Sequence, residues 1–204
     1  MPKKLMVVPD KVRKQETLEI APIPVNVYRK TIAEELKSNP DITPEACLRI
    51  YRDMAVIREF ETMLDNIKKL GSYQGIEYDH AGPAHLSIGQ EGAAVGECFH
   101  LTVEDHIFGS HRSHGEIIAK GLRAVQELCG GGLIGVMENY FDGSILKVVQ
   151  AHDANWEGLS ISAKGKKKPF FSTIEEEEIG VDFLLYGLLS EIFGRNNGFN
   201  LGMG

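Results

Sequence analysis

The chain has 204 residues, 43% of them hydrophobic and 25% charged, which is the composition of an ordinary globular protein with room for one substantial core. Its formal net charge of −7 argues against broad binding to nucleic acid or an anionic membrane, so any anion site must be local. The three widely spaced cysteines match no zinc or redox spacing, and no hydrophobic run reaches membrane-spanning length. We therefore expect buried thiols in a cytoplasmic protein.

Residues 1–40 are predicted to form an extended N-terminal arm. The stretch "APIPVNVY" at 21–28 contains two prolines, which bar regular helix, and alternating apolar residues that could lie along a surface. At Thr43 the pattern changes, because Thr43 is a good N-cap and Pro44 a good first helical residue. Apolar residues then recur at helical steps as far as Gly71, which predicts a long helix.

The middle of the chain mixes loop, helix and a candidate strand. Residues 72–88 are expected to be loop, and "GQEGAAVGECFHL" at 89–101 a short helix with small side chains. The stretch "DHIFGSH" at 105–111 is a short strand candidate, and another helix is expected to begin near Ser113.

Residues 127–180 have a character of their own. They include a glycine triplet, a possible strand "SILKVVQ" at 144–150, a basic run, and an acidic run at 175–178 that we interpret as solvated surface. A helix buried on several sides is expected over 181–194. The chain then closes with "GRNNGFNLGMG", which matches neither the P-loop nor the GxGxxG pattern and by itself indicates only a flexible loop.

The stretch "FGSHRSHGE" at 108–116 is a candidate site with three interpretations. A metal could use His111 and His114, with help from His106, but no carboxylate or thiolate stands at helical spacing and Arg112 would repel a cation. An anion fits better, because a helix start offers amides and Arg112 offers a fork suited to phosphate. A surface arginine beside ordinary hydrogen-bonded histidines stays open on residue types alone.

The stretch "HLSIGQE" is a second candidate. His85 precedes a helix that starts near a glycine, although a lone loop histidine is more often a surface or capping residue than a catalyst. Gln90 and Glu91 would lie in the first helical turn, where they could serve the free amides. A general-base role for Glu91 is possible, but its charge already has a structural use.

In their order along the chain, four stretches resemble the alpha subunit of the thiamine-diphosphate-dependent 2-oxo acid dehydrogenases. They are "YRDMAVIREFETMLDNI", "HLSIGQEGAAVG", "HRSHGEIIAKG" and "EIFGRNNGFNLGMG". That family includes the decarboxylating components of the pyruvate, branched-chain and acetoin dehydrogenases, and the resemblance covers about half of the chain.

The resemblance implies a role for each matching residue. His111 and Arg112 stand where the family contacts the cofactor's diphosphate. His85 matches a histidine at the mouth of the active site that orients or protonates substrate, and His114 matches a second histidine lining the same cavity. The implied reaction is thiamine-diphosphate-dependent decarboxylation of a 2-oxo acid, or cleavage of acetoin. The acyl group then passes to a lipoyl-bearing acyltransferase partner.

The implied fold is α/β and helix-rich, the first part of a doubly wound parallel-sheet domain that binds thiamine diphosphate. Residues 41–126 and 181–204 would supply this partial domain, and 127–180 would be an insertion of unknown role. The family's Gly-Asp-Gly segment and the asparagine after it, which bind Mg²⁺, are absent from the sequence. The resemblance also implies that the glutamate that activates the cofactor comes from the beta subunit or beta half of the enzyme. We therefore expect the N-terminal part of a longer alpha subunit, or of a fused alpha–beta chain, in an oligomer.

Two other functions stay open at this point. One is a non-catalytic assembly module of the same kind of complex, and the other is a domain that binds a different phosphate through "HRSHG". Convergence of His85, His111, Arg112 and His114 on one cleft would favour the enzyme, whereas scattering over the surface would favour assembly.

Overall fold

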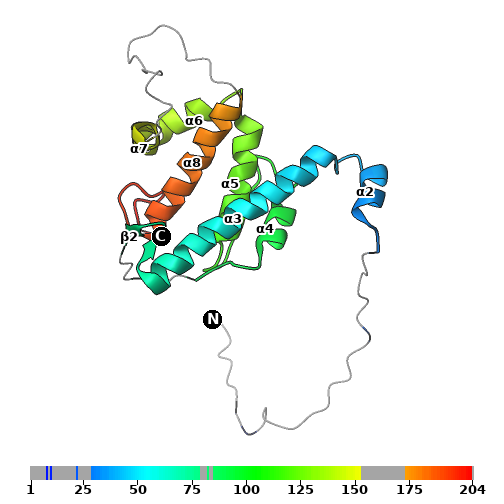
Figure 1. Cartoon of the computed structure of the whole chain (residues 1–204), viewed down its shortest axis with the longest axis horizontal. Helices are drawn as coiled ribbons and strands as arrows, with labels where there is room; N and C mark the ends of the chain where they lie inside the picture. Colours follow the sequence, from blue (N-terminus) through cyan, green and yellow to red (C-terminus); the bar gives the residue numbers. More distant parts are fainter. Residues whose placement is uncertain are drawn as a thin grey trace, which may run out of the picture. The chain divides into compact units, whose positions relative to one another are not determined.

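The computed structural model describes residues 29–78, 82, 85–152 and 173–203, together with the single residues 8, 10 and 22 (Figure 1). The chain divides into two compact units, Met1–Ile42 and Thr43–Gly204. The second unit carries every predicted site residue.

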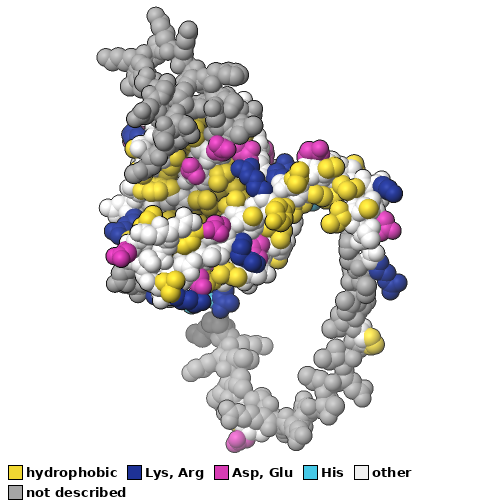
Figure 2. Space-filling model, in the orientation of Figure 1, with side chains coloured by type: hydrophobic (Ala, Val, Ile, Leu, Met, Phe, Trp, Pro, Cys, Tyr) yellow, Lys and Arg dark blue, Asp and Glu magenta, His cyan; other side chains and the backbone are white. Residues whose placement is uncertain are grey.

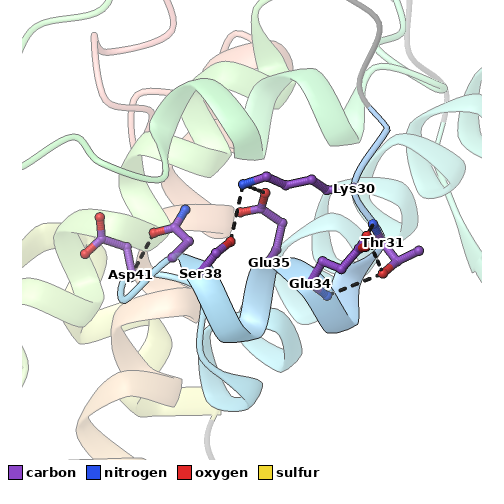
Figure 3. A network of polar contacts seen from close by, with 7 residues as sticks. Lys30, Thr31, Glu34, Glu35, Ser38 and Asp41 are labelled. Atoms are coloured by element: carbon purple, nitrogen blue, oxygen red, sulfur yellow. Dashed lines mark hydrogen bonds and ion pairs between the residues drawn. The ribbon is translucent and has the colours of Figure 1, made fainter.

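The described part of the first unit is built on one short helix, α2 (Ile32–Ser38). Thr31 caps it through a reciprocal box, in which the Glu34 carboxylate accepts from the Thr31 amide at 2.7 Å and the Glu34 amide donates to the Thr31 hydroxyl (Figure 3). Lys30 pairs with Glu35 at 3.1 Å. The helix buries none of its residues, so local capping rather than a core holds it. It corrects the expectation of an extended arm at these positions, and most of the predicted arm lies outside the described residues.

The described part of the second unit is helical apart from one small antiparallel ladder, in which Ser72 faces Glu77 and Tyr73 faces Ile76. Its elements are α3 (Pro44–Leu70), β1 (Ser72–Tyr73), β2 (Ile76–Glu77), α4 (Glu91–Cys98), α5 (His114–Leu128), α6 (Leu133–Asn139), a 3₁₀ turn η1 (Tyr140–Gly143), α7 (Ser144–His152) and α8 (Thr173–Ile192). Helix α5 contacts α3, α4 and α8, and α7 contacts α6 and α8.

The long helix predicted from Thr43 to Gly71 is confirmed as α3. The Thr43 hydroxyl accepts from the Ala46 amide at 3.1 Å, and Pro44 occupies the first helical position. Gly71 ends the helix with a φ of 68°, a left-handed conformation in which a residue without Cβ is unstrained.

Both candidate strands are wrong. Residues 105–111 form no regular element, since a short extended segment needs a neighbouring strand to hold it and none pairs with it in the described part of the chain. Residues 144–150 lie in α7, where Ile145, Leu146 and Val149 are buried at a helical spacing. The doubly wound parallel sheet is thus not seen among the described residues, whose sheet is the β1–β2 ladder.

Two hydrophobic clusters organise the second unit. The first joins α3, α4, α5 and α8 around Ile57, Leu64 and Ile118. The second joins α6 and α7 to α8 around Met137 and Ile145. The described part of the predicted insertion therefore packs into a second cluster, which also includes Val125 of α5 and Phe183 of α8.

The acidic run at 175–178 lies in α8, and two of its glutamates differ from the solvated surface expected of the run. Glu176 is buried and accepts a hydrogen bond from the Gly130 amide at 2.9 Å. Glu177 pairs with Arg52 of α3. These two acids connect α8 to other parts of the chain, because Glu176 accepts from the turn after α5 and Glu177 pairs with α3.

Candidate functional site

The four predicted site residues gather around the first turn of α5. His111 and Arg112 lie in the turn before the helix, and His114 is its first residue. His85 comes from the loop that leads to α4, and its ring meets the ring of His111 edge to face with centroids 5.0 Å apart. Residues from separate stretches of the sequence are thereby brought into contact.

Ser87 fastens the loop of His85 to the turn before α5. Its side chain is 1% exposed, and its hydroxyl donates to the backbone carbonyl of Arg112. The turn is braced from within as well, because the Ser113 hydroxyl donates to the Ser110 carbonyl at 2.6 Å. The Arg112 side chain is left exposed beside His111 on this fixed backbone.

Glu61 of α3 lies beneath both segments and is fully buried. Its Oε2 accepts from the Ser87 amide at 2.6 Å, and its Oε1 lies 3.0 Å from Nδ1 of His114. Sequence reasoning missed this residue. A signal was present, because position 61 falls between Ile57 and Leu64 on the buried face of α3, and a carboxylate there needs partners.

Arg58, one turn before Glu61, reaches the other end of the same loop. Its guanidinium donates to both oxygens of Glu91, at 2.6 and 2.9 Å, and the Gly89 amide donates to Glu91 at 3.0 Å. The hydrogen bonds from Arg58, followed by that from Gly89, lower the pKa of Glu91 to about 2. The charge of Glu91 is therefore used structurally, as its position in the first turn of α4 led us to expect.

Replacing Glu91 with glutamine is expected to lower the free energy of unfolding at pH 7 by about 1–2 kcal/mol. The pKa shift alone corresponds to about 3 kcal/mol, but Arg58 is half exposed and water weakens the pair. Since the pKa of Glu91 is depressed in the folded state, its contribution is present above pH 4.5 and is lost as the pH falls through about 2. Urea unfolding at several pH values measures it.

A cycle with Arg58→Gln supplies the control for this prediction, because the double variant should lose little more than either single variant. A difference between wild type and Glu91→Gln that stays constant down to pH 2 would contradict the assignment.

The outer surface of the site suits an anion. Ser113 makes no side-chain cap on α5, so its hydroxyl leaves the first amides of the helix to another acceptor. Arg112 and His111 are exposed beside those amides, and within the described ranges no carboxylate pairs with Arg112. The same ranges contain no group of three or more histidine, cysteine, aspartate or glutamate side chains placed to hold a metal ion.

Comparison with known proteins identifies relatives through this part of the chain. The family described as "Dehydrogenase E1 component" matches residues 52–143. The alpha subunit of acetoin:2,6-dichlorophenolindophenol oxidoreductase from Bacillus subtilis is 39% identical over 80 residues, 39% of this chain and 22% of the relative. The pyruvate dehydrogenase E1 component subunit alpha of Rhizobium meliloti is 34% identical over 116 residues, 52% of this chain and 31% of the relative.

A longer match runs to the mitochondrial pyruvate dehydrogenase E1 component subunit alpha type II of Ascaris suum. It is 28% identical over 151 residues, 66% of this chain and 36% of that protein. The chain thus spans between about a fifth and about a third of the length of these relatives. No solved structure matches it. None of the helices in the described ranges has the length and hydrophobicity to cross a membrane.

Proposed function

We propose that the chain, whose residues 52–143 match the dehydrogenase E1 component family and which is similar to alpha subunits of that family, is the N-terminal part of the alpha subunit of a thiamine-diphosphate-dependent 2-oxo acid dehydrogenase. The reaction of the whole enzyme would be decarboxylation of a 2-oxo acid, or cleavage of acetoin, with transfer of the acyl group to a lipoyl-bearing acyltransferase.

The gathering of His85, His111, Arg112 and His114 around one helix start is the observation that carries this proposal. Arg112 and His111 would bind the diphosphate, since both are exposed beside the uncapped amides of α5. His85 would meet the substrate at the exposed side, and His114, which is 15% exposed, would move protons deeper in the site.

The residues present fit the diphosphate end of thiamine diphosphate, which when bound supplies the carbanion chemistry of decarboxylation. They do not provide a cage for Mg²⁺, because no cluster of three potential ligands occurs in the part of the chain that the structure describes. We propose that the metal ligands and the activating glutamate come from residues outside this sequence, the glutamate from a beta subunit or beta half.

Exposed hydrophobic side chains support association with such a partner. Phe108, three residues before His111, is 98% exposed, and Leu48 and Tyr51 project from α3, along which Figure 2 shows hydrophobic side chains on the face in view. These surfaces also favour the alternative of a non-catalytic assembly module. In either case the chain would work as part of an oligomer.

We propose that the parallel strands of a doubly wound domain likewise lie outside the described residues, since 105–111 is not one of them. In the three-part division, 1–40 is an arm, 41–126 and 181–204 form the partial cofactor domain, and 127–180 is an insertion. The family match ends at residue 143 and α8 begins at Thr173, and both positions fall inside the range 127–180. The boundaries of the insertion are therefore our proposal. The cytoplasmic location also stays a prediction.

Titration of thiamine diphosphate with Mg²⁺ into the 204-residue chain, with and without its beta partner, tests the proposal. We expect weak binding and no turnover by the chain alone, and tighter binding when the partner is present. Turnover of a 2-oxo acid by the isolated chain would refute the division of the site between two chains. Equal binding with and without the partner would favour a general anion-binding domain, and partner binding without any cofactor binding would favour the assembly module.

A further inference from the structure

We infer that Glu61 is a positioning residue that fixes the tautomer of His114, with the proton on Nδ1 and the lone pair on Nε2. The role of His114 in the reaction rests on the proposed function, but the tautomer does not. No part of the sequence pattern points to this pair, because Glu61 and His114 are 53 positions apart and lie on different helices.

The argument starts from what a buried carboxylate can do. Glu61 is 0% exposed, so water cannot satisfy its oxygens and the protein has to. One oxygen accepts from the Ser87 amide at 2.6 Å. We take the other oxygen to accept as well, so the contact at 3.0 Å between that oxygen and His114 places the hydrogen on Nδ1.

The tautomer decides what His114 offers to a ligand. With Nδ1–H held by Glu61, a neutral ring presents Nε2 as a hydrogen-bond acceptor and a base. The ring is 15% exposed at the start of α5, in the turn that follows Arg112. His114 would therefore take protons at Nε2, while Glu61 stabilises the cation that results.

The substitution Glu61→Gln gives an unusually sharp test. The glutamine amide has the shape of the carboxylate, but one end accepts and the other donates. Ser87 is 1% exposed, and its amide can only donate, so the oxygen of the new side chain has to face Ser87. The nitrogen of that side chain then faces His114, which has to accept at Nδ1 and carry its proton on Nε2. The substitution reverses the tautomer without removing a side chain.

Two-bond ¹H–¹⁵N correlation spectra of the histidine-labelled chain read the tautomer directly, in the alkaline range where an ordinary imidazole is neutral. The chain has seven histidines, and the spectrum of His114→Gln identifies the signal of interest. We expect the Nδ1–H form in the wild type and the Nε2–H form in Glu61→Gln. Glu59→Gln is the matched control, since Glu59 lies on the same helix but pairs with the Tyr73 hydroxyl. It should leave the wild-type form.

An Nε2–H form in the wild type, or the same tautomer in wild type and Glu61→Gln, would overturn the inference. The wild-type spectrum decides this even where Glu61→Gln fails to fold. In the enzyme assembled with its beta partner, Glu61→Gln should lower kcat by on the order of a hundredfold and leave the affinity for thiamine diphosphate unchanged. Loss of the proposed function would leave the tautomer result intact, so the two failures are distinguishable.

Discussion

Replacement of Ile118 with alanine is expected to lower the free energy of unfolding by about 3–4 kcal/mol. Ile118 is 0% exposed and lies one turn after His114, in the cluster formed by α3, α4, α5 and α8. Removal of its outer carbons would leave a cavity that the surrounding helices cannot close without moving. Urea unfolding followed by circular dichroism measures the change.

Ile117→Ala is the matched control, because it makes the same chemical change at the preceding residue of the same helix. Ile117 is 37% exposed, so its loss should cost less than about 1 kcal/mol. Equal destabilisation by the two substitutions would mean that α5 does not bury Ile118 in the core while leaving Ile117 at the surface.

Replacement of Arg112 with alanine is expected to weaken binding of thiamine diphosphate to the assembled enzyme by about 10- to 100-fold. A hydrogen bond to a charged group contributes about 1.5–3 kcal/mol, and each 1.4 kcal/mol is a factor of ten in the dissociation constant. Arg112→Lys keeps the charge but not the two-pronged geometry, so it should recover only part of the affinity. Isothermal titration with the beta partner and Mg²⁺ present gives the dissociation constants.

Arg52→Ala is the control for this effect. Arg52 is also an exposed arginine of the second unit, but it pairs with Glu177 of α8. Its removal should leave the dissociation constant unchanged. An equal loss of affinity in both variants would show that the overall charge of the chain, rather than the position of Arg112, governs attraction of the cofactor.

Local signals in the sequence were enough to predict α3, α4 and α5 and the second half of α8, but not α2, α6 or α7. The cap at Thr43, the glycine at 71 and the helical apolar pattern between them predicted α3, because each acts within a few residues. The same kind of signal failed for 144–150, where alternating and helical patterns overlap in a short apolar run. Burial against α8 decides that α7 is a helix, and this contact comes from residues about 35 positions away.

The site was predictable in its exposed half only. His85, His111, Arg112 and His114 stand in recognisable stretches, and a family resemblance carries over residue by residue. Glu61 also stands in one of these stretches, but the resemblance gave it no role, and a glutamate on a long helix is ordinarily a surface residue. Its importance comes from burial and from a partner 53 positions away, which are properties of the packed chain.

The acids at the site are each bonded to a donor group, and this affects the electrostatic force on a polyanion that approaches a chain of net charge −7. Glu91 forms an ion pair with Arg58, and Glu61 is bonded to the Ser87 amide and the His114 ring. Neither carboxylate is therefore placed to form an ion pair with Arg112 at the surface. At physiological ionic strength, surface charges beyond about 8 Å are largely screened. An approaching diphosphate would therefore be repelled weakly at long range and attracted only in its last few ångströms, so added salt should speed its departure and change its arrival little.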